Sequence, residues 1–350
     1  MSRFIASGAY GCIYHPPYDC KGADLKEDVV SKLVKNDFTS ETEYNVSQLL
    51  KNEKGFLLIK KKCNIASTAI KKMEKGCELI DKDPKLDKDY LLMYSTFING
   101  IELVDYIKKD FTIDRLMKSF LFLCNQIEIM INHKIIHHDL HFGNIMYNYN
   151  KKNFVIIDFG LAINSSKFYL NNKLNYPYLK DAIFKYTPSW KYFSLEEHLL
   201  SYLIHEGPID ESIIKETLKI YLDKHTMCNV PNFCNKYIET SIHYFKKYVN
   251  KPKEYVIRKF LSYWNTWDYY KISLHILKIY YKLKIHYPEL LLLLLLMIHP
   301  IPKYRPSVID VNKNLQILLN SYSNKIGYEG KIDKHLTDDL SKTIKTLSSI

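Results

Sequence analysis

The sequence contains little glycine or proline and no long apolar run. Eleven glycines and 12 prolines in 350 residues exclude collagen-like and proline-rich linker architectures. The longest apolar stretch, residues 290–298, is nine residues long, whereas a membrane-spanning helix needs about 20. Residues 1–11 have no apolar signal core. We therefore expect no membrane segment and no secretion signal, and we interpret the leucine run as a buried helix.

Cysteine is scarce and irregularly placed. The seven cysteines are odd in number and never spaced C-x-x-C. This pattern suggests neither a disulfide framework nor a zinc site. We therefore expect mostly buried thiols, a reducing compartment and a cytoplasmic location.

What is present is the composition of a globular protein. Hydrophobic residues make up 47% and charged residues 25%, enough apolar mass to bury a core. Lys and Arg exceed Asp and Glu by 50 − 38 = 12, but the abundant lysine and 29 tyrosines are typical of an AT-rich genome. The densest basic run is Lys60–Lys62, too short for a nucleic-acid arm, so we expect no nucleic-acid partner.

The chain begins with strand patterns and continues with helical ones. A helix is expected from Thr39 or Ser40 through Leu50, and a buried helical stripe runs from Leu116 to Ile131. The strand candidates are Arg3–Ser7, Cys12–Tyr14, 28–34, 56–60, 90–97 and a hairpin of 145–147 with 154–157. From about Ser194 the pattern is helical. This order predicts an α+β chain of two lobes that divide near residues 98–100.

The residues that indicate chemistry lie on either side of the expected hairpin. Asp139 and Asn144 are five residues apart on one loop, and Asp158 follows the apolar run 155–157. Carboxylate and amide oxygens suit Mg²⁺, which keeps further positions for phosphate and water. Asn144 and Asp158 are therefore the candidate metal ligands.

The segments H-x-D-L-x-x-x-N at 137–144 and D-F-G at 158–160 resemble the catalytic and metal loops of eukaryotic-type protein kinases. Residues 5–14 are similar to the glycine-rich loop, 29–32 to the third-strand lysine motif and 304–307 to the R-P-S segment near the end of such domains. The resemblance spans about residues 1–320. The opening G-A-Y-G-C-I-Y-H-P-P is also similar to putative kinases of large DNA viruses, which would place the protein in the host cell or virion.

The resemblance implies a bilobal kinase domain over residues 1–322, with an N-lobe of about 1–98, a C-lobe of 99–322 and a tail of 323–350. It implies an ATP- and Mg²⁺-dependent kinase acting on Ser or Thr of a protein substrate, with no membrane partner. Asp139 would be the catalytic base, assisted by Lys32 and Asn144. The implied nucleotide-binding residues are Ile5, Ala6, Ser7, Gly8, Ala9, Tyr10, Gly11, Ile13, Val30, Lys32, Glu43, Met146 and Asp158.

Two of these assignments have competing interpretations. Taken alone, Lys32 would be interpreted as a solvated strand lysine, but strand alternation places it on the same face as Val30 and Val34. Its carboxylate partner is Glu43 or Glu41, and we choose Glu43 because it shares a helix face with Val46 and Leu50. Alternatively, Glu43 closes a capping box with Ser40.

Three departures from the family pattern bear on function. His138 replaces the Arg that clasps a phosphorylated activation loop, so we hypothesise that activity does not need that phosphorylation. His141 replaces a common Lys; it either donates to the γ-phosphate or is a loop histidine, and D-x-H-x-x-N also occurs in aminoglycoside and choline kinases. No A-P-E is present, although Thr187–Trp190 lies in that region, and Glu196 or Glu197 is assigned as the substitute partner of Arg305. A small-molecule phosphotransferase and a pseudokinase scaffold are therefore the alternative functions.

Overall fold

The structure, a computed structural model, describes residues 3–8, 11–25, 28–71, 73, 76–82, 89–109 and 111–325. The chain divides into two compact units. The first unit comprises Met1–Tyr106 with Phe142–Ile163, and the second comprises Ile107–His141 with Asn164–Ile350. Residues 142–163 therefore pack with the N-terminal segment, a division that the sequence pattern, with its single boundary near residue 98, did not predict.

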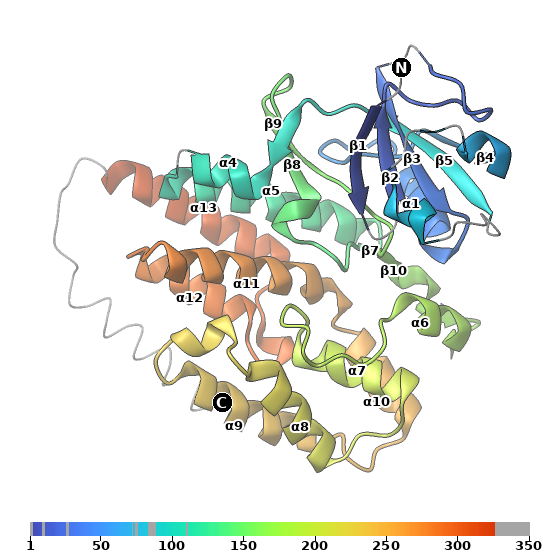
Figure 1. Cartoon of the computed structure of the whole chain (residues 1–350). Helices are drawn as coiled ribbons and strands as arrows, with labels where there is room; N and C mark the ends of the chain where they lie inside the picture. Colours follow the sequence, from blue (N-terminus) through green and yellow to red (C-terminus); the bar gives the residue numbers. More distant parts are fainter. Residues whose placement is uncertain are drawn as a thin grey trace. The chain divides into compact units, whose positions relative to one another are not determined.

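The first unit is built on antiparallel strands. Its elements are β1 (Arg3–Gly8), β2 (Gly11–His15), β3 (Val29–Lys35), α1 (Phe38–Leu49), β4 (Lys61–Ile65), α2 (Ser67–Ile70), α3 (Glu78–Asp81), β5 (Tyr90–Thr96), β6 (Gly100–Glu102), η1 (Phe142–Asn144), β8 (Ile145–Asn148) and β9 (Asn153–Ile156). Five strands form one sheet in the order β1-β2-β3-β5-β4, drawn in blue to cyan in Figure 1. Three more form the sheet β6-β8-β9, which contains the expected hairpin.

Alternation along the central strands separates two cores. Leu33 of β3 and Leu92 of β5 are register partners in a large cluster on one face of the five-stranded sheet. Val34 and Leu91, the next pair along, belong to a smaller cluster on the other face, against which Tyr44 of α1 packs. Lys32 lies on this second face by the same alternation. The face toward α1 therefore carries the functional lysine.

The segment between α1 and β4 differs from its prediction. Residues 56–60 were expected to form a strand, but only Phe56 makes an isolated bridge, to Ile156, and regular pairing starts at Lys61. The segment is still extended, because the Leu57 amide donates to the Ile156 carbonyl and the Lys60 amide donates to the Tyr94 carbonyl. Its apolar residues thus follow two different sheets in turn, which periodicity alone does not reveal.

The cysteine prediction was wrong. Six of the seven cysteines form disulfides, Cys12–Cys77, Cys20–Cys63 and Cys228–Cys234, and only Cys124 is a buried free thiol. The first two pairs are 65 and 43 positions apart in sequence, and the sheet brings their Cα atoms to 5.7 and 6.1 Å. Spacing along the chain carries no information about such pairs. The argument for a reducing compartment therefore loses its basis.

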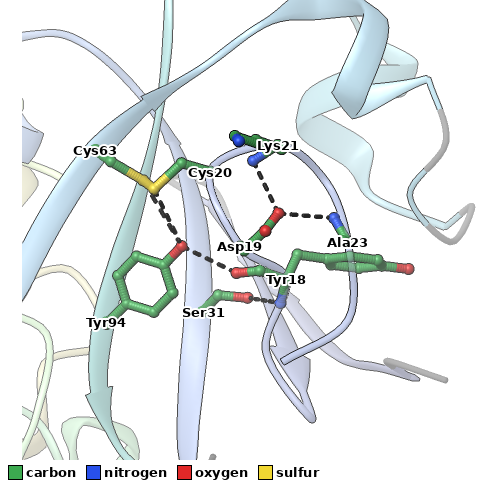
Figure 2. Close-up of a disulfide and its surroundings, with 8 residues drawn as sticks. All are labelled: Tyr18, Asp19, Cys20, Lys21, Ala23, Ser31, Cys63 and Tyr94. Carbon is green, nitrogen blue, oxygen red and sulfur yellow. Dashed lines mark hydrogen bonds between the residues drawn. A yellow bond between two sulfur atoms is a disulfide. The ribbon is translucent and has the colours of Figure 1, made fainter. Parts of the chain in front are cut away.

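The Cys20–Cys63 disulfide is tied into the sheet by a tyrosine, as Figure 2 shows. The Tyr94 hydroxyl lies 3.7 Å from the sulfur of Cys20 and 3.6 Å from that of Cys63. The same hydroxyl donates to the Tyr18 carbonyl at 2.9 Å. The disulfide thus joins β4 to the loop after β2 at a point that β5 also contacts.

The second unit is mainly helical and is drawn largely in yellow to red in Figure 1. Its elements are α5 (Ile113–Asn132), β7 (Ile135–Ile136), η2 (Ser165–Phe168), β11 (Tyr169–Leu170), β12 (Lys173–Leu174), α6 (Tyr176–Ala182), α7 (Leu195–His205), α8 (Glu211–Leu222), η3 (Thr226–Asn229), α9 (Phe233–Lys246), α10 (Lys253–Leu261), η4 (Trp264–Thr266), α11 (Trp267–Lys282), α12 (Pro288–Met297), η5 (Pro302–Tyr304) and α13 (Val308–Lys325). α4 (Leu103–Lys109) and β10 (Ile163–Asn164) lie where the chain passes between the units.

The apolar stripes predicted for the second unit are buried. Leu116, Phe120 and Ile127 of α5 are almost fully buried, and α5 packs against α13. The leucine run forms α12, in which Leu290 and Leu294 are fully buried. Among the residues that the structure describes, no helix is long and apolar enough to cross a membrane.

Candidate active site

Lys32 of β3 is the centre of an ionic group in the first unit. Its ammonium donates to Glu43 of α1 at 2.8 Å and to Asp158, just after β9, at 3.1 Å. Burial alone would lower the pKa of Lys32, but the charges of Glu43 and Asp158 outweigh it and raise the pKa above its usual value. Lys32 therefore carries a permanent positive charge beside two carboxylates, which excludes the interpretation as a solvated strand lysine.

The structure distinguishes the two candidate glutamates of α1. Glu43 is buried and pairs with Lys32, whereas Glu41 is exposed and contacts Lys62. The capping-box interpretation of Glu43 was wrong, because the helix begins earlier. Asp37 is the N-cap, and Ser40, at the third helical position, completes the box.

The expected glycine-rich loop joins β1 to β2, and its tip, Ala9 and Tyr10, lies outside the described residues. Ile5, Ala6 and Gly8 are exposed, and Ser7 is half-buried. A Cβ on Gly11 would meet the Leu33 carbonyl oxygen at 2.6 Å, so packing against β3 requires this glycine. Among the described residues, a Cβ on Gly8 would meet only the Gly11 carbonyl oxygen, at 3.9 Å. Gly8, unlike Gly11, is thus not confined by the described part of the chain, and it is exposed to an approaching ligand.

Three more predicted nucleotide contacts belong to the first unit. Ile13 of β2 is the register partner of Lys32, so both lie on the same face of the sheet. Val30, two residues before Lys32, shares that face and is buried. Met146 lies on β8, in the other sheet of this unit, and is half-buried.

Asn144 and Asp158 are brought together by the β8–β9 hairpin. Ile145 pairs with Ile156, and the Ile157 amide donates to the Asn144 carbonyl at 2.9 Å. Asn144 therefore lies opposite the residue that precedes Asp158, at the same end of the hairpin. Asp158 has a left-handed backbone, φ 62°, a sparsely populated region that aspartate tolerates better than most residues.

This pair of side chains fits a magnesium ion. An amide and a carboxylate are the hard oxygen ligands that Mg²⁺ binds, and two protein ligands leave positions for phosphate and water. The Asp158 side chain is 37% exposed, so a ligand can approach it from solvent. Lys32 supplies a fixed cation beside the same carboxylate, at Oδ1.

In the second unit, Asp268 holds the loop that carries Asp139. The buried Asp268 carboxylate, at the start of α11, accepts hydrogen bonds from the amides of His137 at 2.6 Å and His138 at 3.0 Å. The Asp139 amide in turn donates to the His137 carbonyl. His138 takes a left-handed backbone, φ 67°, within this turn. The backbone before Asp139 is thus fixed, while the Asp139 side chain itself is 28% exposed.

Asp139 lines a small hollow of about 280 Å³. Its other walls include His141, Trp190, Tyr192 and His275. The His141 Nε2 atom lies 3.7 Å from a carboxylate oxygen of Asp139, and Tyr192 stacks on His275 with ring centroids 4.1 Å apart. Burial, and then the charge of His141, lowers the pKa of His275 to about 3, so that ring is neutral. The hollow therefore combines one acidic group with flat aromatic walls, and Lys271 also lines it.

His138 is enclosed by aromatic rings. It is 2% exposed and stacks on Phe184 at 4.9 Å and on Phe193 at 4.8 Å, between ring centroids. Burial, followed by the charge of Lys271, holds the pKa of His138 well below its usual value. A neutral ring between two phenylalanines has no charge with which to attract a phosphate.

The segment that lacks an A-P-E motif has an equivalent ion pair. Glu196 of α7 accepts from the Arg305 guanidinium, one contact being 3.0 Å, and both side chains are fully buried. The next residue, Glu197, binds Lys271 of α11 at 2.7 Å instead. Of the two substitutes that the sequence left open, Glu196 is therefore the partner of Arg305.

Two supporting residues, Asp268 and Lys271, were missed in the sequence. Both lie in the first turns of α11, a helix in which most side chains are buried and apolar. A charged residue within such a helix is the signal that was available, because buried charges are rare unless they are paired. It was overlooked because their partners are about 70 to 130 positions away in the chain.

The family of the chain is identified by comparison with known proteins. A search of curated proteins found no significant match. The protein kinase domain family matches residues 1–314, which is most of the chain. The match includes both the lysine with its two carboxylates and the loop that bears Asp139. The chain therefore belongs to the protein kinase family.

Proposed function

We propose that the protein transfers the γ-phosphoryl group of ATP to a Ser or Thr hydroxyl of a protein substrate, with Mg²⁺ as the cofactor. The observation that carries this proposal is the contact of Lys32 with both Glu43 and Asp158. Such a lysine has a fixed position and a permanent charge, as a group that binds phosphate oxygens needs. A binding scaffold has no need for this cation beside a metal-binding carboxylate, which disfavours the pseudokinase alternative.

The chain's own residues divide the work of the reaction. Lys32 binds phosphate oxygens of ATP, and Glu43 keeps its ammonium in place. Asn144 and Asp158 would hold Mg²⁺, which would supply positive charge to neutralise the phosphates. Asp139 accepts the proton of the substrate hydroxyl. The hydroxyl oxygen bonds to the γ-phosphorus as the bond between that phosphorus and the departing ADP breaks. Charge and placement, more than covalent chemistry, then determine the rate.

The hollow at Asp139 favours a protein acceptor over a metabolite. Its volume, about 280 Å³, is below the range of roughly 300–1,000 Å³ typical of small-molecule sites. A side chain on a peptide has to insert only its hydroxyl end there, whereas a metabolite would have to be enclosed. The small-molecule alternative is based on His141 and on the missing A-P-E motif. His141 lies 3.7 Å from Asp139, and we assign it as a donor to the γ-phosphate.

One experiment tests the proposal directly. The purified chain is incubated with γ-labelled ATP, Mg²⁺ and a mixed protein extract, and the labelled molecule and amino acid are identified. Label on Ser or Thr is expected. Label on a metabolite supports the small-molecule kinase, label on Tyr corrects the acceptor, and a thermal shift with ATP and Mg²⁺ but no label supports the scaffold.

Two substitutions test the residues. Asp139→Asn keeps the shape of the side chain but removes its ability to accept a proton, so phosphoryl transfer should fall by a factor on the order of 100 or more. ATP binding, measured with a fluorescent nucleotide, should change little. Lys32→Ala should instead weaken nucleotide placement. Full activity in both variants would show that the site has been assigned wrongly.

We also propose that activity does not depend on phosphorylation of residues 165–193. The ring stack around His138 occupies the place of a cationic phosphate receptor. Phosphatase treatment of the active protein should therefore leave its rate unchanged. A loss of activity that returns on rephosphorylation would contradict this.

A further inference from the structure

One hollow of the first unit lies away from Lys32 and Asp158. It has a volume of about 770 Å³ and is lined by the end of α1, the segment 53–60, the end of β5 and the β8–β9 hairpin. Neither Lys32, Asp158 nor any residue of the glycine-rich loop lines it. It is therefore distinct from the proposed nucleotide site, and its volume lies within the usual range for ligand sites.

The rim of this hollow is strongly basic. Four exposed lysines line it, Lys51, Lys54, Lys60 and Lys151, against one glutamate, Glu53, so the charge is 4 − 1 = +3. None of the four lysines forms an ion pair within the described part of the chain. Elsewhere on α1 and β3–β4, by contrast, Lys32 and Lys62 are both neutralised by glutamates. We call this site the basic hollow.

The wall of the basic hollow is apolar and held in place. Leu57, Leu58 and Ile98 are half-buried, so part of each side chain reaches the surface. Backbone bonds fix the wall at Gly55, whose carbonyl accepts from Ile156. They also fix it at Ile59, whose amide donates to the Ser47 hydroxyl at 2.9 Å. A wall that is already ordered loses little entropy when a ligand binds.

The lining indicates which ligand fits. A compact phosphate is bound best by backbone N–H groups at a helix N-terminus, but the helix end that lines this hollow is the C-terminal end of α1. Single-stranded nucleic acid needs free aromatic faces, and the one aromatic lining residue, Phe56, already packs on Phe159 at 5.9 Å. An extended peptide with alternating acidic and apolar side chains satisfies both the lysines and the leucines.

We propose that the basic hollow is a docking site for an acidic, apolar segment of a partner protein. Its carboxylates pair with the four lysines, and its apolar side chains cover Leu57, Leu58 and Ile98. Electrostatic attraction speeds the encounter, and burial of apolar area sets the lifetime of the complex. The proposal does not depend on phosphoryl transfer, because no residue of the hollow belongs to the reaction.

The probe is a fluorescein-labelled twelve-residue peptide of alternating Glu and Leu, and its binding to the full chain is followed by fluorescence anisotropy. Two control peptides carry Lys in place of Glu, or Ser in place of Leu. Lys54→Glu combined with Lys151→Glu should weaken binding about tenfold at low salt, because two lysines that attract the peptide's carboxylates are replaced by repelling glutamates. The matched control, Lys219→Glu with Lys313→Glu, makes the same change in net charge on exposed lysines of α8 and α13 and should stay within twofold.

Three other outcomes would overturn the proposal. Equal weakening by both double variants means that only net charge matters, and equal binding of the serine peptide means that the apolar wall is not used. Displacement of the peptide by a twelve-nucleotide single strand of higher affinity points to nucleic acid. Measuring binding in the Asp139→Asn chain without ATP keeps this test separate from that of the catalytic site.

Discussion

The two units use charged side chains in opposite ways. In the first unit, Lys32 and Asp158 form an ion pair whose side chains are 13% and 37% exposed. In the second, Arg305 and Glu196 are 0% exposed, and Lys271 and Glu197 are 2% and 3% exposed. A partly exposed pair can exchange its partner for a ligand, whereas a fully buried pair can only hold a fixed structure. The first unit therefore supplies charges that can bind a ligand, and the second supplies a rigid support for the partly exposed Asp139.

The sharpest test of this comparison replaces one glutamate in each unit. Glu196→Gln leaves the Arg305 charge buried without its counter-charge, which should cost about 3–5 kcal/mol of unfolding free energy. Glu43→Gln removes a largely buried partner but leaves Lys32 paired with Asp158, whose side chain is 37% exposed, so its cost should be smaller than that of Glu196→Gln. Urea denaturation measures both values.

Activity should show the reverse order at temperatures where both variants are folded. Glu43→Gln should lose phosphoryl transfer because the lysine is no longer held, while Glu196→Gln should retain a larger share. Similar stability losses in the two variants would show that burial does not separate the two roles.

The disulfides provide a second contrast, with a smaller effect. Removing Cys20–Cys63 in the first unit, by replacing both residues with Ser, frees a loop of about 43 residues and should cost about 4 kcal/mol in a chain-entropy estimate. Removing Cys228–Cys234 in the second unit frees a loop of only six positions and should cost about 2 kcal/mol. Urea melts with and without a dithiol reductant measure the difference.

Each double variant is the control for the disulfide that it lacks. A reductant can no longer remove the stability that this disulfide supplies in the wild type. A wild-type melt that is unaffected by reductant would contradict the contribution of both disulfides. A larger loss at Cys228–Cys234 would contradict the dependence on loop length.

Local patterns were sufficient to predict most of the framework. The hairpin at Ile145–Ile156, the helix over Ile113–Asn132 and the leucine helix follow from runs of apolar residues with a clear period. The choice of Glu43 also depended on a local feature, its shared helix face with Val46. In each case the deciding contacts lie a few residues apart.

The contacts that the sequence did not predict join distant segments. Asp268 holds the loop of Asp139 from 130 positions away, and the disulfide partners are up to 65 positions apart. The start of α1 was placed late because Asp37 caps it, so Phe38 is already helical. Residues 56–60 were assigned to a strand because they are apolar and extended, yet they bond to two different sheets. The pattern of neighbouring residues contains no information about these particular pairings.

The smallest expected effect is that of acid, which should lower the stability of the second unit but not the contribution of Lys32 in the first. Burial lowers the pKa of His198 to about 3 from 6.5, so the folded second unit keeps this ring neutral while the unfolded chain protonates it. The stability from a lowered pKa is complete above pH 6.5 and is lost as pH falls toward 3, by about 2 kcal/mol at pH 5. The raised pKa of Lys32 acts in the opposite range, because its contribution is complete below about 10.5 and is lost only above that value.

The three tryptophans, Trp190, Trp264 and Trp267, all lie in the second unit, so their fluorescence reports on that unit alone. Urea midpoints followed by this fluorescence should fall between pH 7 and pH 5. His198→Phe keeps an aromatic ring beside Tyr221 and removes the titrating group. The free energy of unfolding should therefore fall by about 2 kcal/mol less between pH 7 and pH 5 in this variant than in the wild type. If His198→Phe loses as much stability as the wild type between these pH values, His198 does not supply the acid sensitivity. The second unit would then owe its acid response to its other histidines of lowered pKa, of which His275 also has a pKa of about 3.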